Sequence, residues 1–161
     1  MIDKSDDERD AWRAWFEAAK REDVSRELVD WQGRLDAELA VLPGRCEMSG
    51  RCCKFDSHGH RLYVTAIEIA WVLNGLDADR LALLRDADLV GVDGCVFQVN
   101  GMCTARELRP LGCRVYLCDP AAKAWQDEVY ERYLKELREM HDRWGVAYRY
   151  LEWRAGLAAA I

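Results

Sequence analysis

The sequence lacks any apolar run near the ~18 residues that a membrane-spanning helix needs. It also lacks a basic surplus: 23 Lys and Arg stand against 29 Asp and Glu, for a net charge of −6. General nucleic-acid binders normally carry excess positive charge, so nucleic acid is an unlikely partner. The chain starts with MIDKSDDERDAW, which has neither the positive start nor the apolar block of a secretory signal. We therefore expect a protein of the cytoplasm that does not enter a membrane.

Several catalytic patterns are absent as well. The sequence has no Ser/His/Asp constellation, no Gly-rich phosphate loop and no dinucleotide fingerprint. It has no C-x-x-C motif, the usual spacing of a thiol–disulfide switch. No catalytic residue follows from the sequence, and whether the protein is an enzyme stays open at this stage. Because there is no internal repeat, linker or low-complexity segment, residues 1–161 are expected to form a single domain.

The hydrophobic pattern predicts a mainly α fold with a small β-hairpin. Residues 1–44 read as two helices over 5–42, separated near Glu22-Asp23 and stopped by Pro43-Gly44. Residues 119–161 read as one long helix or two in sequence, with Asp119 as N-cap and a bend at Gly145. These helices are expected to form a scaffold at both ends of the chain.

The middle segment, 45–118, is expected to have shorter elements. Polar and apolar residues alternate over 61–65, which predicts a short strand. Thr65 and Glu68 form a capping box that opens a helix ending before Gly75. A further helix is predicted over 78–86. A hairpin is predicted over 95–105, turning at Asn100-Gly101.

Cysteine is the residue type that sets this middle segment apart. All seven cysteines of the chain lie in it: Cys46, Cys52, Cys53, Cys95, Cys103, Cys113 and Cys118. In a reducing compartment such a set indicates metal binding before disulfides. Thiolates select zinc, copper(I) and iron–sulfur clusters, and four of them complete a zinc site or one cubane cluster. We therefore predict that all seven are candidate ligands of a metal centre.

The adjacent pair Cys52 and Cys53 bears on the kind of metal. Side chains of neighbouring residues generally point apart, so this pair is expected to suit a multinuclear cluster, or two neighbouring sites, better than one zinc ion. The hairpin offers a second geometric test. A two-residue turn would place Cys95 and Cys103 on opposite faces, whereas a bulged three-residue loop would pair Phe97 with Cys103 and bring both to one face. If both cysteines bind one metal site, the bulged form is expected.

Basic residues flank the cysteines, and two histidines follow the adjacent pair. Arg109 and Arg114 are the predicted cofactor-binding residues, because an arginine near thiolates favours the anion and can donate to cluster sulfur. Ordinary surface charge is the alternative interpretation. His58 and His60 are left open as replacement ligands, while His141, in the middle of a helix, is expected to be structural.

Three sequence blocks together resemble the YkgJ-like cysteine-cluster family, described as zinc- or iron-chelating. Members have a C-x-x-C-G-x-C-C block, then a C-x-F/Y hairpin ending in Cys, then R-P-x-x-C-R-x-F/Y. The matching segments here are Cys46–Cys53, Cys95–Cys103 and Arg109–Cys118, in that order. One difference is Ser49, which stands where the family has its second cysteine. Flagellin lysine methylases resemble this family in their cysteine cluster, and an iron–sulfur centre is associated with them.

The resemblance implies metal or cluster binding by the seven cysteines. The leading hypothesis is a protein with a Cys-ligated iron–sulfur cluster, of the 4Fe-4S kind, or zinc, with a redox or accessory role. The first alternative is a modifying or redox enzyme that uses the cluster. The second is a protein-interaction module whose central loops are held by zinc. The sequence identifies no protein partner.

Overall fold

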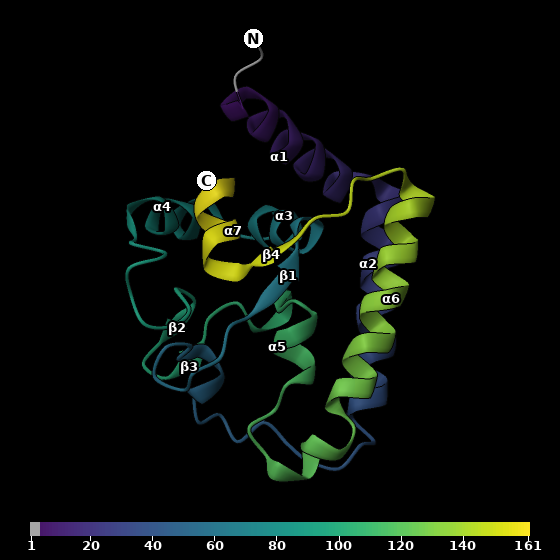
Figure 1. Cartoon of the computed structure of the whole chain (residues 1–161), viewed down its shortest axis with the longest axis vertical. Helices are drawn as coiled ribbons and strands as arrows, with labels where there is room; N and C mark the ends of the chain where they lie inside the picture. Colours follow the sequence, from purple (N-terminus) through teal and green to yellow (C-terminus); the bar gives the residue numbers. More distant parts are fainter. Residues whose placement is uncertain (1–3) are drawn as a thin grey trace.

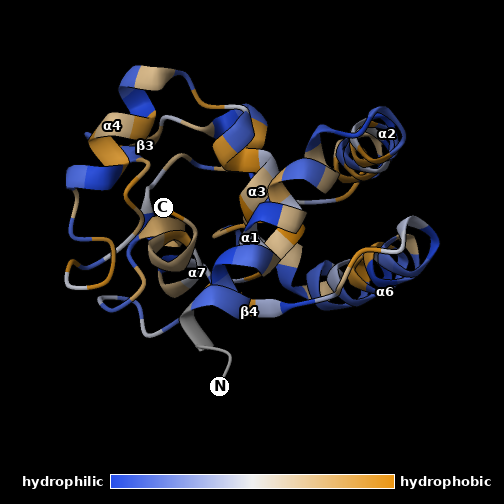
Figure 2. Cartoon of the chain, turned by 90° about the horizontal axis from the view of Figure 1, so that it is seen from above, coloured by the Kyte–Doolittle hydropathy of each residue, from blue (hydrophilic) through white to orange (hydrophobic). Residues whose placement is uncertain are grey.

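Two long antiparallel helices, α2 (Glu22–Leu39) and α6 (Gln126–Trp144), stand side by side (Figure 1). They belong to a computed structural model that describes residues 4–161. The rings of Trp31 and Tyr133 pack between them, with centroids 5.9 Å apart. Ion pairs such as Arg34–Glu136, at 2.9 Å, join their outer faces. Seen from above, this pair forms one lobe and the remaining elements a second (Figure 2).

The N-terminal prediction is confirmed closely. Helix α1 spans Lys4–Lys20, and α2 begins at Glu22, because Arg21 adopts an extended backbone (φ −62°, ψ 137°) that interrupts the helix. Helix α1 packs against α3 (Ala66–Asn74), which is apolar on most of its surface and lies at the centre of the second lobe. The mainly α class with a small β-hairpin is therefore confirmed.

The capping box at α3 is also confirmed. Thr65 Oγ1 accepts a hydrogen bond from the Glu68 backbone N–H, and the Glu68 carboxylate accepts one from the Thr65 backbone N–H. Strand β1 (Tyr63–Thr65) precedes this helix, and α4 (Ala78–Asp86) follows it with the predicted bounds. No helix within residues 4–161 has the length and apolar character needed to cross a membrane.

The C-terminal prediction needs correction. Asp119 does cap a helix, but this is the short 3-10 helix η3 (Pro120–Ala124), and the long helix begins later. Gly145, at φ 64°, ends α6, and the chain then forms strand β4 (Tyr150–Glu152) and helix α7 (Trp153–Ala160). β4 is extended because it pairs antiparallel with β1, a partner nearly ninety residues away that helical spacing alone does not reveal.

The middle segment holds five more short elements that place the cysteines. They are the 3-10 helix η1 (Arg51–Cys53), the hairpin strands β2 (Gln98–Val99) and β3 (Met102–Cys103), and the 3-10 helix η2 (Arg106–Leu108), which is followed by helix α5 (Leu111–Val115). Helix α5 was not predicted from the sequence. These segments lie together at one side of the second lobe, below α3 and α7 in the view of Figure 1.

Candidate metal centre

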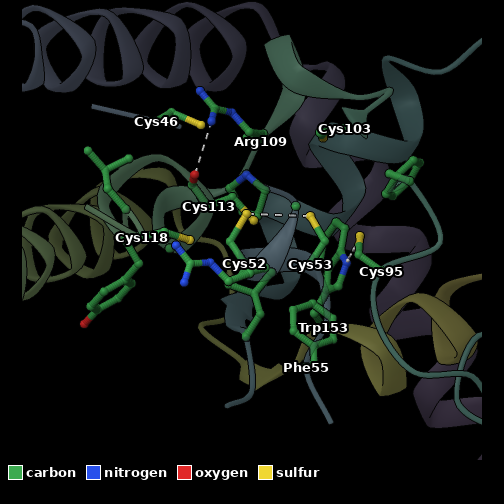
Figure 3. Close-up of a pocket in the computed structure, with 18 of the residues that line it drawn as sticks. Cys46, Cys52, Cys53, Phe55, Cys95, Cys103, Arg109, Cys113, Cys118 and Trp153 are labelled. Carbon is green, nitrogen blue, oxygen red and sulfur yellow. Dashed lines mark hydrogen bonds between the residues drawn. The ribbon is translucent and has the colours of Figure 1, made fainter. Parts of the chain in front are cut away.

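A single cavity of about 800 Å³ gathers the predicted ligands. All seven cysteines line it, although they come from separate segments: the loop after α2, η1, the turn before β2, β3, α5 and the loop after α5. All seven are free thiols. Figure 3 shows Cys52, Cys53 and Cys113 in the middle of the group, with Cys46 and Cys118 on the Arg109 side and Cys95 beside Trp153. Folding thus brings the whole predicted set of thiols to one place.

The backbone ties the two cysteine-bearing loops together. The Cys95 N–H donates to the Cys53 carbonyl at 2.7 Å, and the Gln98 side-chain amide donates to the Gly50 carbonyl at 2.7 Å. The two contacts fix the η1 loop against the hairpin. Cys53 and Cys95 are held close in space by these contacts although 42 positions separate them.

Gly94 makes the first of these contacts possible. Its φ is +104°, and a Cβ there would lie 2.4 Å from the Cys53 carbonyl oxygen. We expect Gly94→Ala to destabilise the protein by about 1–3 kcal/mol and to lower metal content, because strain and clash fall on the joint between the loops. Urea unfolding and metal analysis measure both effects. Gly59→Ala is the matched control, since its φ is +66° but its Cβ would meet nothing within 4 Å; an equal loss in both variants would contradict the prediction.

The hairpin does not have the bulged loop that was expected if Cys95 and Cys103 bind one metal site. Gln98 pairs with Cys103 and Val99 with Met102, so the turn has two residues. Asn100 and Gly101 both have positive φ, of 50° and 77°, which is the type I′ geometry that matches strand twist. Cys95 nevertheless lines the same cavity as Cys103. It precedes the strand in a turn, where the Gln98 N–H donates to the Cys95 carbonyl at 3.0 Å, so strand alternation does not govern its side chain.

The expectation that Cys52 and Cys53 point apart is also wrong. Their sulfur atoms are 3.9 Å apart (Figure 3). The reason is local, because the pair ends the 3-10 turn η1, which Gly50 enters at φ 73°. Two ligands of one tetrahedral zinc ion stand about 3.8 Å apart, given Zn–S bonds of about 2.3 Å. The adjacent pair therefore does not count against zinc.

Burial and crowding disfavour thiolate in this cavity. The Cys53 contact is the largest cause that raises the pKa of Cys52, and burial adds to it. Contact with Cys52 lowers the pKa of Cys53, but the Cys95 thiol and burial outweigh this and raise it to about 12. Burial, followed by the Cys53 and Cys103 thiols, raises the pKa of Cys113 well above its usual range. A bound cation would stabilise the thiolates against burial and against one another. Metal uptake should therefore release protons from the thiols.

The two predicted arginines have different surroundings. Arg109 lines the cavity, donates to the Cys113 carbonyl at 3.4 Å, and acts electrostatically to lower the pKa of that thiol, although burial outweighs it. Arg114 is buried and does not line the cavity. Its guanidinium donates to Asp36 at 2.7 Å and to the carbonyl oxygens of Arg109 and Glu107, each at 2.7 Å. Arg114 thus holds the backbone of Glu107 and Arg109, which positions the Arg109 side chain, and links this backbone to Asp36 of α2.

The histidines and Ser49 also have defined places. His58 and His60 both line the cavity, and a ring nitrogen of His60 lies 3.0 Å from the Cys52 carbonyl oxygen. His141 is fully buried in α6 with Nδ1 2.8 Å from the Leu137 carbonyl oxygen, in agreement with a structural role. Ser49 lines the cavity and accepts hydrogen bonds from the Arg51 N–H and guanidinium, at 3.4 and 3.3 Å.

Trp153 is the functional candidate that sequence reasoning missed. Its apolar character and C-terminal position suggested scaffold, yet it lines the cavity and its indole N–H points at the Cys95 sulfur, 3.3 Å away (Figure 3). No motif near Trp153 indicated this role. The contact exists because β4 pairs with β1 and so carries the start of α7 to the cavity.

Comparison with known proteins adds no relative. The chain matches no protein-family model, no curated protein and no solved structure.

As the side chains stand, no three Cys, His, Asp or Glu residues within 4–161 form a ready coordination shell for one ion. The site is a thiol-lined cavity with arginine and indole donors at its wall.

Proposed function

We propose that this protein binds an iron–sulfur cluster through its cavity cysteines and serves a redox or accessory role in the cytoplasm. The observation that carries the proposal is the convergence of seven free thiols, from six separate segments, on one cavity of about 800 Å³. Thiolates are the ligands that hold such clusters, and four of them suffice for one. The resemblance to the YkgJ-like family supports metal binding by these cysteines, leaves zinc against iron open, and stays a prediction.

The wall of the cavity supports the proposal independently of the thiol count. Arg109 lines it, and the Arg106 guanidinium lies 3.9 Å from the Cys46 sulfur. The Trp153 N–H donates to the Cys95 sulfur. Positive charge and N–H donors next to sulfur stabilise the anionic thiolates and sulfides of a cluster.

Zinc is the second candidate, favoured by the 3.9 Å separation of the Cys52 and Cys53 sulfurs. Anaerobic purification followed by iron, zinc and acid-labile sulfide analysis decides between the two. A brown protein that absorbs near 400 nm and contains iron and sulfide supports the cluster. A colourless protein with stoichiometric zinc supports zinc, and one that takes up neither metal under reducing conditions contradicts both.

Ser49 provides a test of how many metal sites the cavity forms. Ser49 lies on the cavity wall beside Arg51, so a cysteine at this position would add an eighth thiol to the cavity. Seven thiols complete one set of four and leave three, so we expect Ser49→Cys to raise the bound iron or zinc by up to one further site, about twofold. Metal-to-protein ratios measure the change. Ser49→Ala is the matched control, and an unchanged ratio in Ser49→Cys would contradict a second, incomplete site.

A further inference from the structure

The indole of Trp153 is the single tryptophan N–H within residues 4–161 that points at sulfur. Trp15 and Trp125 donate to backbone carbonyl oxygens and Trp144 to the Glu27 carboxylate, while the remaining three tryptophan N–H groups have no partner. An indole nitrogen can only donate, so its contact with Cys95 has a defined direction. At 3.3 Å this is a short N–H···S approach.

Trp153 is held rigidly in this position. It is 2% exposed, its backbone N–H donates to the Leu62 carbonyl at 2.8 Å, and its ring packs on Phe97 with centroids 5.9 Å apart. The next residue, Arg154, donates to both carboxylate oxygens of Asp56 and to the Val92 carbonyl. Helix α7 is therefore fastened to the chain on either side of the Cys53–Cys95 joint, and the indole cannot easily turn away.

We propose that Trp153 is a positioning residue that sets the electronic character of the metal-bound Cys95 sulfur. A hydrogen bond to a ligating sulfur withdraws electron density from it. For a cluster, this stabilises the reduced form, which carries one more negative charge, and so raises the reduction potential. For zinc, it makes the bound thiolate a weaker nucleophile. The inference rests on the proposed function and adds the residue that tunes it.

The test uses the full-length, metal-loaded protein with Trp153→Phe, which keeps an aromatic ring and removes the N–H. We expect iron and sulfide content to be retained and the one-electron potential to fall by about 59 mV, the equivalent of a tenfold change in equilibrium constant. Electrochemical titration supplies the electron and measures the shift. Trp31→Phe makes the same replacement in the α2–α6 lobe, where the indole N–H has no hydrogen-bond partner, and should leave the potential unchanged.

Each failure has a separate meaning. An unchanged potential in Trp153→Phe with full cluster content, or an equal shift in Trp31→Phe, overturns the role of Trp153 and leaves the cluster proposal intact. A wild-type protein without iron, sulfide or zinc overturns both. If Trp153→Phe fails to fold, wild-type protein labelled with ¹⁵N-tryptophan is used instead. Pulsed EPR of its reduced cluster should show coupling to one indole nitrogen, and its absence overturns the inference.

If the metal is zinc, the same variant is assayed by alkylation. We expect iodoacetamide to modify Cys95 about tenfold faster in zinc-loaded Trp153→Phe than in the wild type, because the thiolate has lost its donor. Mass spectrometry identifies the modified cysteine. An unchanged rate at Cys95 overturns the inference for the zinc protein.

Discussion

Cys53→Ser is expected to lower the amount of bound metal at least about tenfold. Changes to residues that only support a ligand already cost 10–100-fold in affinity, and Cys53 occupies a more central place than those. Its sulfur lies 3.9 Å from that of Cys52, and its carbonyl accepts the Cys95 N–H. Oxygen of serine is a poor donor to soft metals, so the site should lose a ligand without losing its shape.

Metal and sulfide analysis of the purified variant, beside its far-UV circular dichroism, checks this expectation. Val99→Ser is the matched control, because Val99 is 53% exposed in the same cysteine-rich segment. The control should keep its full metal content. A Cys53→Ser protein that is folded and retains wild-type metal content would remove Cys53 from the ligand set.

Glu68→Ala is expected to lower the free energy of unfolding by about 3 kcal/mol. Glu68 is fully enclosed in the protein, and its carboxylate accepts hydrogen bonds from the Leu111 N–H at 2.8 Å and from the N–H and hydroxyl of Thr65 at 2.8 and 2.9 Å. Alanine would leave these buried donors without an acceptor, at a cost of about 1–3 kcal/mol each. Because Leu111 begins α5, which bears Cys113, metal affinity should fall too.

Chemical denaturation checks the effect on stability. Glu22→Ala, at an exposed position of α2, is the control and should change stability by no more than about 0.5 kcal/mol. A loss in Glu68→Ala as small as in the control would show that water replaces the carboxylate at no cost.

The pH dependence of Glu68 has a definite sign. Burial raises its pKa above the ordinary 4.5, although hydrogen bonds from Leu111 and Thr65 oppose the shift. A carboxyl group with a raised pKa in the folded state contributes stability below pH 4.5 that is lost as pH rises through the folded pKa. Relative to Glu68→Gln, which does not titrate, the wild type should therefore lose stability as pH rises from 4.5. A flat or rising difference in unfolding free energy would contradict this.

The sequence by itself determined the local elements and the identity of the ligand candidates. The stripe of apolar residues predicted α1 and α2, the Thr65–Glu68 pair predicted the start of α3, and Asn100-Gly101 predicted the hairpin turn. These features depend on residues within a few positions of one another, where helical period, capping and turn chemistry act. The seven cysteines were likewise visible as a set without any knowledge of where they meet.

Only the tertiary structure decided what depends on distant contacts. Residues 150–152 form a strand because β1 pairs with them, and that pairing brings Trp153 to Cys95. Arg114 looked like a cofactor residue, but Asp36 of α2 holds its guanidinium away from the cavity. Strand alternation failed for Cys95 because the strand begins only at Gln98. For Trp153 and Arg114 the partner is far away in the chain, so no local pattern encodes the contact.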